Sequence, residues 1–190
     1  MIDYRKIGQA VQRYQDLGYL NIEVPWLISR QAASFTAPEG IRQFETFAGC
    51  LPASGEQSFI HMYRLGQLRP GRFVTVTPCF RDEPVLDTWH KQHFLKVETI
   101  CIFDILPSDE TVHKEILFAV GCAQLVMKEL GVETTPVQVS PTQYDLISPT
   151  KIELGSYGYR YLGGIPWVYG TGLAEPRFSR CLEQLNTVEY

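Results

Sequence analysis

The stretch from residue 80 to residue 94 reads FRDEPVLDTWHKQHF, and it follows the run FVTVT at residues 73–77. Valine and threonine in such a run are typical of a β-strand. The polar residues 83–90 contain a proline and predict a loop, and residues 94–104 (FLKVETICIFD) predict a second strand. We therefore expect two paired strands joined by a polar loop, with Arg81 and Phe94 close together on one sheet face.

Four side chains of this stretch have the chemistry that a bound ATP requires. Arg81 could hold a phosphate with two hydrogen bonds and stabilise negative charge on it. Glu83 could accept a hydrogen bond from the adenine amino group, Phe94 could stack on the base, and His90 could contact the terminal phosphates. Taken alone, these residues leave ordinary alternatives open: a surface ion pair, a core phenylalanine and a solvated histidine.

The remaining sequence predicts an α+β domain. Helical spacing of apolar residues predicts a helix over 4–17 and a long helix from Ser108 to Leu130. The other expected elements are a loose helix over 59–68, strands at 22–28, near 136–148, at 151–156 and at 165–169, irregular structure with short strands over 30–56, and a last helix from about Pro176. Because the strands cluster as neighbours instead of alternating with helices, a largely antiparallel sheet flanked by helices is expected.

Composition predicts one globular domain over residues 1–190. Hydrophobic residues make up 45% and charged residues 20% of the chain, and no internal repeat or linker interrupts it. The net charge of −4 gives no reason to expect a nucleic-acid partner. The five cysteines form no CxxC pair, which favours reduced thiols over a disulfide framework or a zinc ribbon. We expect no membrane span and a cytoplasmic location, since the N-terminus has no signal-peptide pattern.

The arrangement strand–FRDE–loop–HKQHF resembles motif 2 of the class II aminoacyl-tRNA synthetases, which reads F-R-x-E, a loop, then R/H-x-x-x-F. The resemblance implies that Arg81, Glu83, His90 and Phe94 bind ATP in the bent form used for amino-acid adenylation.

The segment FLKVE at residues 94–98 is similar to the continuation of motif 2 in the phenylalanyl-type enzymes. The matching glutamate there helps to hold the α-amino group of the substrate, which implies this role for Glu98. Lys96 stands where a glutamine is common in those enzymes.

Two later segments resemble further parts of the same family. GTGLAEPR at residues 170–177 resembles motif 3, which implies that Gly172 lets ATP lie against the backbone and that Arg177 contacts its γ-phosphate. An alanine at 174 and a proline before the arginine depart from the usual motif. IELGS at residues 152–156 resembles the E-L-G strand of the family, which implies that Glu153 binds ATP directly or through Mg²⁺.

Two earlier segments complete the resemblance. The first helix together with GYLNIEVPWLI at residues 18–28 resembles motif 1, which implies a homodimer through this segment. ASGEQ at residues 53–57 is similar to the loop over the amino-acid pocket, with a glycine in place of the usual proline. This similarity implies that Glu56 and Gln57 contact the amino end of the substrate.

The resemblance as a whole implies a class II synthetase-like fold and an enzyme that forms an aminoacyl-adenylate from ATP and an amino acid. Arg81 and Arg177 would be the catalytic residues, with ATP and Mg²⁺ as the cofactors. We expect no tRNA-binding domain, so the acyl acceptor stays open among tRNA, a carrier protein and a small amine. The alternative is a non-catalytic paralogue that acts as a regulatory or accessory subunit, and the presence of both arginines favours the enzyme.

Overall fold

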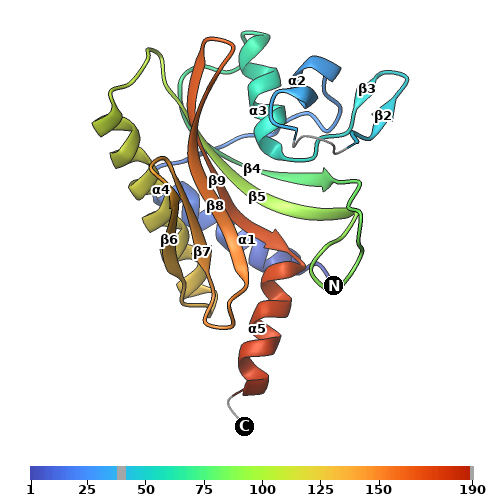
Figure 1. Ribbon diagram of the computed structural model, residues 1–190, viewed down its shortest axis with the longest axis vertical. Coiled ribbons are helices and arrows are strands. Elements are labelled where there is room, and N and C mark those ends of the chain that lie inside the picture. Colours follow the sequence, from blue (N-terminus) through green and yellow to red (C-terminus); the bar gives the residue numbers. More distant parts are fainter. Residues whose placement is uncertain (38–41, 189–190) are drawn as a thin grey trace.

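Seven strands form the central sheet of the computed structural model, which describes residues 1–37 and 42–188 (Figure 1). Their order is β1-β4-β5-β9-β8-β7-β6, and each neighbouring pair is antiparallel except β1 and β4. The strands are β1 (Leu20–Asn21), β4 (Gly71–Phe80), β5 (His93–Ile102), β6 (Thr135–Ser140), β7 (Gln143–Ile147), β8 (Glu153–Leu162) and β9 (Ile165–Glu175). The predicted α+β class with a largely antiparallel sheet is confirmed.

Helices pack on both faces of this sheet. On one face, α1 (Tyr4–Asp16) and α4 (Asp109–Glu129) share the larger apolar core with the strands. On the other face, α3 (Gly55–Arg64) packs on β4 and β5, and α2 (Arg30–Ser34) packs on α3 (Figure 1). A small hairpin of β2 (Glu45–Thr46) and β3 (Gly49–Cys50) lies beside α2, and α5 (Arg177–Val188) continues from the end of β9.

The two long helices begin and end where the sequence predicts. The Asp3 carboxylate caps α1 by accepting hydrogen bonds from the amides of Arg5 and Lys6, and Gly18 follows the helix at a φ of +93°. The Ser108 hydroxyl caps α4 by accepting a hydrogen bond from the amide of Thr111 at 3.2 Å. Both caps satisfy amides that have no partner inside the helix.

The expected strand at 22–28 is wrong, because pairing with β4 is limited to Leu20 and Asn21. One further bond joins the Ile22 amide to the Val74 carbonyl at 3.0 Å, and Pro25 then has no amide hydrogen to donate. Ile28 makes only an isolated bridge to Cys50. The segment is therefore extended but leaves the edge of the sheet.

The expected helix over 59–68 begins four residues earlier than predicted, at Gly55. The Ser54 hydroxyl accepts a hydrogen bond from the Glu56 amide at 3.3 Å and caps α3. Residues 53–57 are consequently a helix start, with Glu56 and Gln57 in its first turn. Of the stretch predicted to be irregular, residues 38–41 lie outside the described part of the chain.

A second, smaller core lies between α3 and the sheet. Its largest member is Trp167 of β9, whose side chain is 0% exposed, and it packs there with Phe59 and Ile60 of α3. This core positions the start of α3 over the sheet. No helix in the described ranges is long and apolar enough to cross a membrane.

Candidate active site

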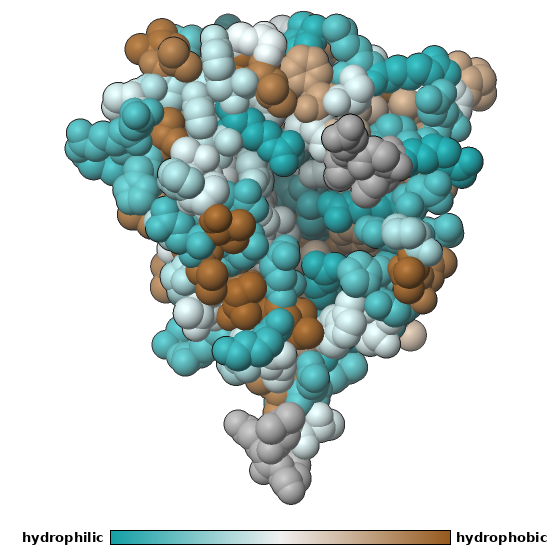
Figure 2. Space-filling model, in the orientation of Figure 1, coloured by the Kyte–Doolittle hydropathy of each residue, from teal (hydrophilic) through white to brown (hydrophobic). Residues whose placement is uncertain are grey.

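A cleft of about 360 Å³ opens on the sheet face that α1 and α4 leave free. Figure 2 shows it as a central hollow lined mainly by hydrophilic residues. Its floor is made by alternate residues of β5, because Phe94, Lys96 and Glu98 line it while Leu95 and Val97 pack into the core with the helices. The cleft runs from the ends of β4 and β9 toward the start of α3.

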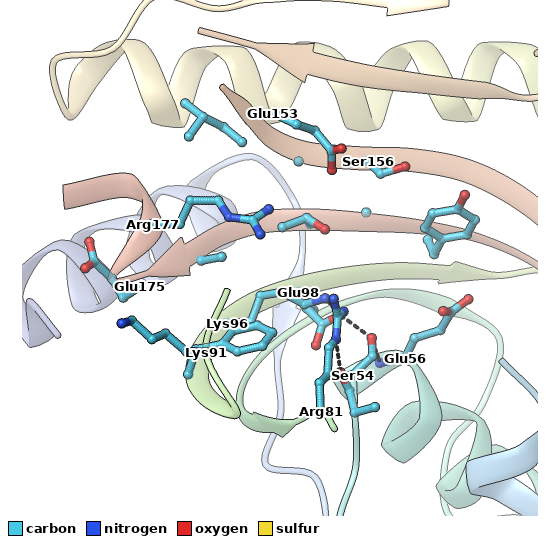
Figure 3. Close-up of a pocket in the computed structure, with 18 of the residues that line it drawn as sticks. Ser54, Glu56, Arg81, Lys91, Lys96, Glu98, Glu153, Ser156, Glu175 and Arg177 are labelled. Atoms are coloured by element: carbon cyan, nitrogen blue, oxygen red, sulfur yellow. Dashed lines mark hydrogen bonds and ion pairs between the residues drawn. The ribbon is translucent and has the colours of Figure 1, made fainter. Parts of the chain in front are cut away.

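Arg81 and Phe94 lie together at one wall of the cleft. The Arg81 amide donates to the Gln92 carbonyl at 2.8 Å, which extends the pairing of β4 and β5 past the last strand residue. The guanidinium carbon lies 5.2 Å from the centroid of the Phe94 ring. Its Nε donates to the Ala53 carbonyl at 3.2 Å (Figure 3). Within residues 1–37 and 42–188 no carboxylate pairs with Arg81, so its charge faces the cleft uncompensated.

The loop after β4 carries His90 and is organised by Asp87. The Asp87 carboxylate accepts from the amides of Trp89 and His90 at 2.6 and 2.7 Å, and the His90 ring lies 3.0 Å from it. The hydrogen bond from the His90 ring and those two amides lower the pKa of Asp87 to about 2. Glu83, His90 and Lys91 all line the cleft. The loop therefore places the predicted adenine and phosphate contacts on the same side as Arg81.

Arg177 and Glu153 stand at the same end of the cleft, on α5 and β8. Arg177 is the first residue of α5, and its Nη2 donates to the Trp89 carbonyl at 3.4 Å. Glu153 is the exposed first residue of β8. Figure 3 shows Glu153 and Arg81 on opposite walls, with Arg177 reaching between them. Two cations and a carboxylate thus surround a space in which a polyphosphate could lie.

Gly172 does not line this cleft but faces α1. A β-carbon on Gly172 would lie 2.8 Å from the Tyr14 ring, and the Tyr14 hydroxyl donates to the Gly172 carbonyl at 3.3 Å. A bulge in the β5–β9 pairing at Val97 and Glu98 turns residue 172 to the helix side and leaves Thr171 on the cleft side. Close packing of the backbone against the buried Tyr14 ring therefore explains why residue 172 is a glycine.

Glu98 lies at the floor of the cleft within a network of donors. Its Oε1 accepts from the Ser54 hydroxyl at 2.5 Å and lies 2.7 Å from the Lys96 Nζ. Its Oε2 accepts from the Gly55 amide and lies 3.8 Å from the Cys79 sulfur. Glu98 and Lys96 are 4% and 6% exposed, so the pair is desolvated. A β-carbon on Gly55 would lie 2.7 Å from Glu98, which explains a glycine there.

Glu56 and Gln57 have different surroundings, although they are neighbours in α3. Glu56 reaches the cleft, where its Oε1 accepts from the Trp167 indole at 2.6 Å and its Oε2 lies 3.5 Å from Arg160. The Gln57 amide instead donates to the Ala33 carbonyl at 2.7 Å and accepts from the Ala53 amide at 2.8 Å. Gln57 thereby holds the loop before α3 in place.

Arg160 and Tyr169 are lining residues that the sequence did not single out. The Arg160 guanidinium lies over the Tyr169 ring at 4.6 Å from its centroid and beside Glu56. The expected strand ended at residue 156, whereas β8 continues to Leu162. The two-residue period from Ser156, which also lines the cleft, reaches Arg160 and was the signal available in the sequence.

The free energy of unfolding of Glu56→Gln, compared with that of the wild type, is expected to increase as pH rises. Burial raises the pKa of Glu56 above its usual 4.5, because the charged form is desolvated. The folded chain then binds more protons than the unfolded chain in the window between these two pKa values. Wild-type stability consequently falls as pH rises through that window, and the glutamine variant is free of this loss.

Urea denaturation of both proteins at a series of pH values from about 4 to about 8 measures this difference. Glu110→Gln is the control, since the Glu110 side chain is exposed and its ion pair with Lys114 lies on the surface of α4. A difference between wild type and Glu56→Gln that stays constant with pH would contradict the prediction.

The sequence matches no protein-family model and no curated protein. Among solved structures, the chain is similar to seryl-tRNA synthetase from Pyrococcus horikoshii complexed with ATP, with 18% identity and a TM-score of 0.73 over 93% of this chain. It is also similar to PylSc, a pyrrolysyl-tRNA synthetase from Desulfitobacterium hafniense, with 17% identity and a TM-score of 0.71 over 95% of this chain. A third similar structure is the cytoplasmic serine–tRNA ligase from Naegleria fowleri in complex with AMP, with 16% identity and a TM-score of 0.71 over 93% of this chain.

These likenesses establish the fold. The chain has the class II aminoacyl-tRNA synthetase-like fold that the sequence motifs predict. It covers 48% and 52% of the two seryl enzymes and 69% of the pyrrolysyl enzyme, so it spans about half the length of the seryl structures. The phenylalanyl-type reading of residues 94–98 and the individual residue roles stay predictions.

Proposed function

We propose that this chain uses ATP to adenylate a small carboxylic acid, with an amino acid as the substrate that the motifs predict. The observation that carries the proposal is the Arg81 guanidinium, which lies over the Phe94 ring at the cleft wall and has no carboxylate partner among the described residues. A half-buried arginine in this position can hold a phosphate with two hydrogen bonds and stabilise negative charge that develops on it.

In the proposed reaction, ATP and the acid bind at opposite ends of the cleft. ATP would lie at the end bounded by Arg81, Arg177 and Glu153, with its base on Phe94 and its amino group at Glu83. The acid would lie farther along the floor, toward Glu98 and the start of α3. A carboxylate oxygen of the acid then attacks the α-phosphorus, the bond from that phosphorus to the bridging oxygen breaks, and pyrophosphate leaves. Positioning and electrostatics supply the catalysis, and no side-chain nucleophile is needed.

Mg²⁺ fits this site only as a companion of ATP. The described residues contain no group of three metal-ligating side chains, and Mg²⁺ is commonly held by one or two carboxylates together with substrate phosphates. Glu153 is the residue that would hold it. When bound, the ion would neutralise part of the triphosphate charge.

The proposed reaction also requires an acceptor for the acyl group. A tRNA, a carrier protein or a small amine could receive the acyl group, and nothing in the cleft favours one of them.

We propose a homodimer through α1 and residues 18–28, supported by Leu20 and Trp26, whose side chains are 60% and 57% exposed. The molar mass in solution, from light scattering, tests this.

The direct test of the function is acid-dependent exchange of labelled pyrophosphate into ATP. The purified chain is expected to catalyse exchange with at least one acid from a panel of the standard amino acids and their 2-hydroxy and 2-deamino analogues. Calorimetric titration with ATP measures nucleotide binding separately. A folded protein that neither exchanges with any acid nor binds ATP would contradict the proposal and favour the non-catalytic paralogue.

A further inference from the structure

Glu98 already has three close protein donors, although it lies at the cleft floor where the substrate amino group is predicted to bind. A carboxylate has about four acceptor positions on its two oxygens. Ser54 and Lys96 approach one Glu98 oxygen at 2.5 and 2.7 Å, and the Gly55 amide and the Cys79 thiol approach the other. The Cys79 sulfur also lies 3.7 Å from the Thr77 carbonyl, so an ammonium group at Glu98 would compete mainly with Ser54, Lys96 and the Gly55 amide.

Lys96 also supplies the charge that an ammonium group would supply. Its side chain is buried beside Glu98, so the two opposite charges compensate each other away from solvent. A second cation at Glu98 would lie close to the Lys96 Nζ, and like charges repel strongly where solvent is excluded. The floor of the cleft is therefore poorly suited to a charged α-amino group.

The other glutamates of the cleft offer no replacement for Glu98. Glu56 is the second carboxylate at the acid end, and it is paired with the Trp167 indole and with Arg160. Three more glutamates line the cleft at the opposite end, in the loop after β4, at the first residue of β8 and at the last residue of β9. Those positions lie on the ATP side of the proposed reaction.

We propose that Lys96 replaces the substrate's α-ammonium group as the counterion of Glu98, so that the site selects carboxylic acids with an uncharged α-substituent. Suitable substrates are 2-hydroxy, 2-oxo or 2-deamino acids of amino-acid size. This inference rests on the proposed function and narrows its substrate class. Recognition of the acid then depends on its carboxylate and its side chain instead of its amino group.

Paired substrates test the inference in the wild-type protein. Pyrophosphate exchange is measured with each amino acid and with its 2-hydroxy and 2-deamino counterparts at equal concentration. The uncharged member of the best pair is expected to give a kcat/KM at least equal to that of the amino acid. A preference for the amino acid of about tenfold or more would overturn the inference while leaving the proposed function intact.

Lys96→Gln tests the assigned residue. Glutamine can still donate a hydrogen bond to Glu98 but leaves its charge uncompensated, so the preference is expected to shift toward the amino acid by about tenfold or more. Lys91→Gln removes another lysine that lines the cleft, and it is expected to change both members of a pair by the same factor. A Lys96→Gln variant that keeps the wild-type ratio would overturn the inference, as would an equal shift in Lys91→Gln.

Binding keeps the inference testable without turnover. Calorimetry with two N-acylsulfamoyl adenosines, one made from an amino acid and one from its 2-deamino analogue, compares the same pair in wild-type protein. Equal or tighter binding of the 2-deamino compound supports the inference even if exchange is absent, a result that would count against the proposed reaction alone. Tighter binding of the amino-acid compound by about tenfold overturns the inference, and failure of both compounds to bind overturns the inference together with the ATP site.

Discussion

Arg81→Ala is expected to lower the rate of acid-dependent pyrophosphate exchange by about 10²–10³-fold, the usual effect of removing a preorganised donor from charge that develops in a transition state. Arg81 lies at the wall of the cleft with its guanidinium against Phe94 and with no carboxylate partner among the described residues. Negative charge spreads over the α-phosphate as the carboxylate attacks. Alanine would leave that charge without the two hydrogen bonds that a guanidinium provides.

Two further variants separate charge, geometry and stability in this experiment. Arg81→Lys keeps the charge but loses the planar fork, so an intermediate loss is expected. Arg69→Ala removes an exposed arginine from the turn before β4 and is expected to leave exchange unchanged. Urea unfolding of each variant shows whether the fold is preserved. Exchange at the wild-type rate in Arg81→Ala would contradict the assignment of this residue.

Trp167→Ala is expected to lower the free energy of unfolding by about 3–5 kcal/mol, the range measured for truncation of large buried aromatic residues. The Trp167 side chain is fully buried between β9 and α3, so alanine leaves a cavity in the smaller core. The change also removes the indole donor that lies 2.6 Å from Glu56 and leaves a buried carboxylate oxygen without that partner. Both effects act in the same direction.

Circular dichroism during urea denaturation measures this loss without relying on tryptophan fluorescence. Trp167→Phe fills more of the cavity but lacks the indole N–H, so its loss is expected to be smaller and to report mainly the Glu56 contact. Phe47→Ala is the matched control, because the Phe47 side chain is fully exposed and its removal is expected to change stability by less than about 0.5 kcal/mol. A loss in Trp167→Ala no larger than that of the control would show that this core contributes little.

The structure connects stability to the proposed chemistry through Trp167 and Ser54. Trp167 supports the smaller core and donates to Glu56 at the acid end of the cleft. Ser54 caps α3 and donates to Glu98 on the cleft floor. Variants at these two positions are therefore expected to affect folding and substrate use together, and Arg81, which is half-buried and has no carboxylate partner among the described residues, is the position at which function is better isolated.

Local patterns in the sequence determined the parts of this protein that depend on neighbouring residues. The β-branched run before residue 80 and the polar loop after it predicted a strand pair, and strand pairing alone brings Arg81 to Phe94 across 13 positions. Caps and helical spacing located α1 and α4 for the same reason, since hydrogen bonds within a helix join residues four apart. The family resemblance of these local motifs also predicted the fold that the solved structures share.

Only the tertiary structure decided which distant groups meet and which face each strand residue occupies. Glu56 meets a tryptophan 111 positions away, and Glu98 meets the capping Ser54 44 positions away. A bulge between β5 and β9 turns Gly172 away from the cleft, and a longer β8 brings Arg160 into it. Such contacts follow from the packing of α3 on the sheet and from strand register, where a shift of one residue reverses the face of a side chain and leaves no local mark in the sequence.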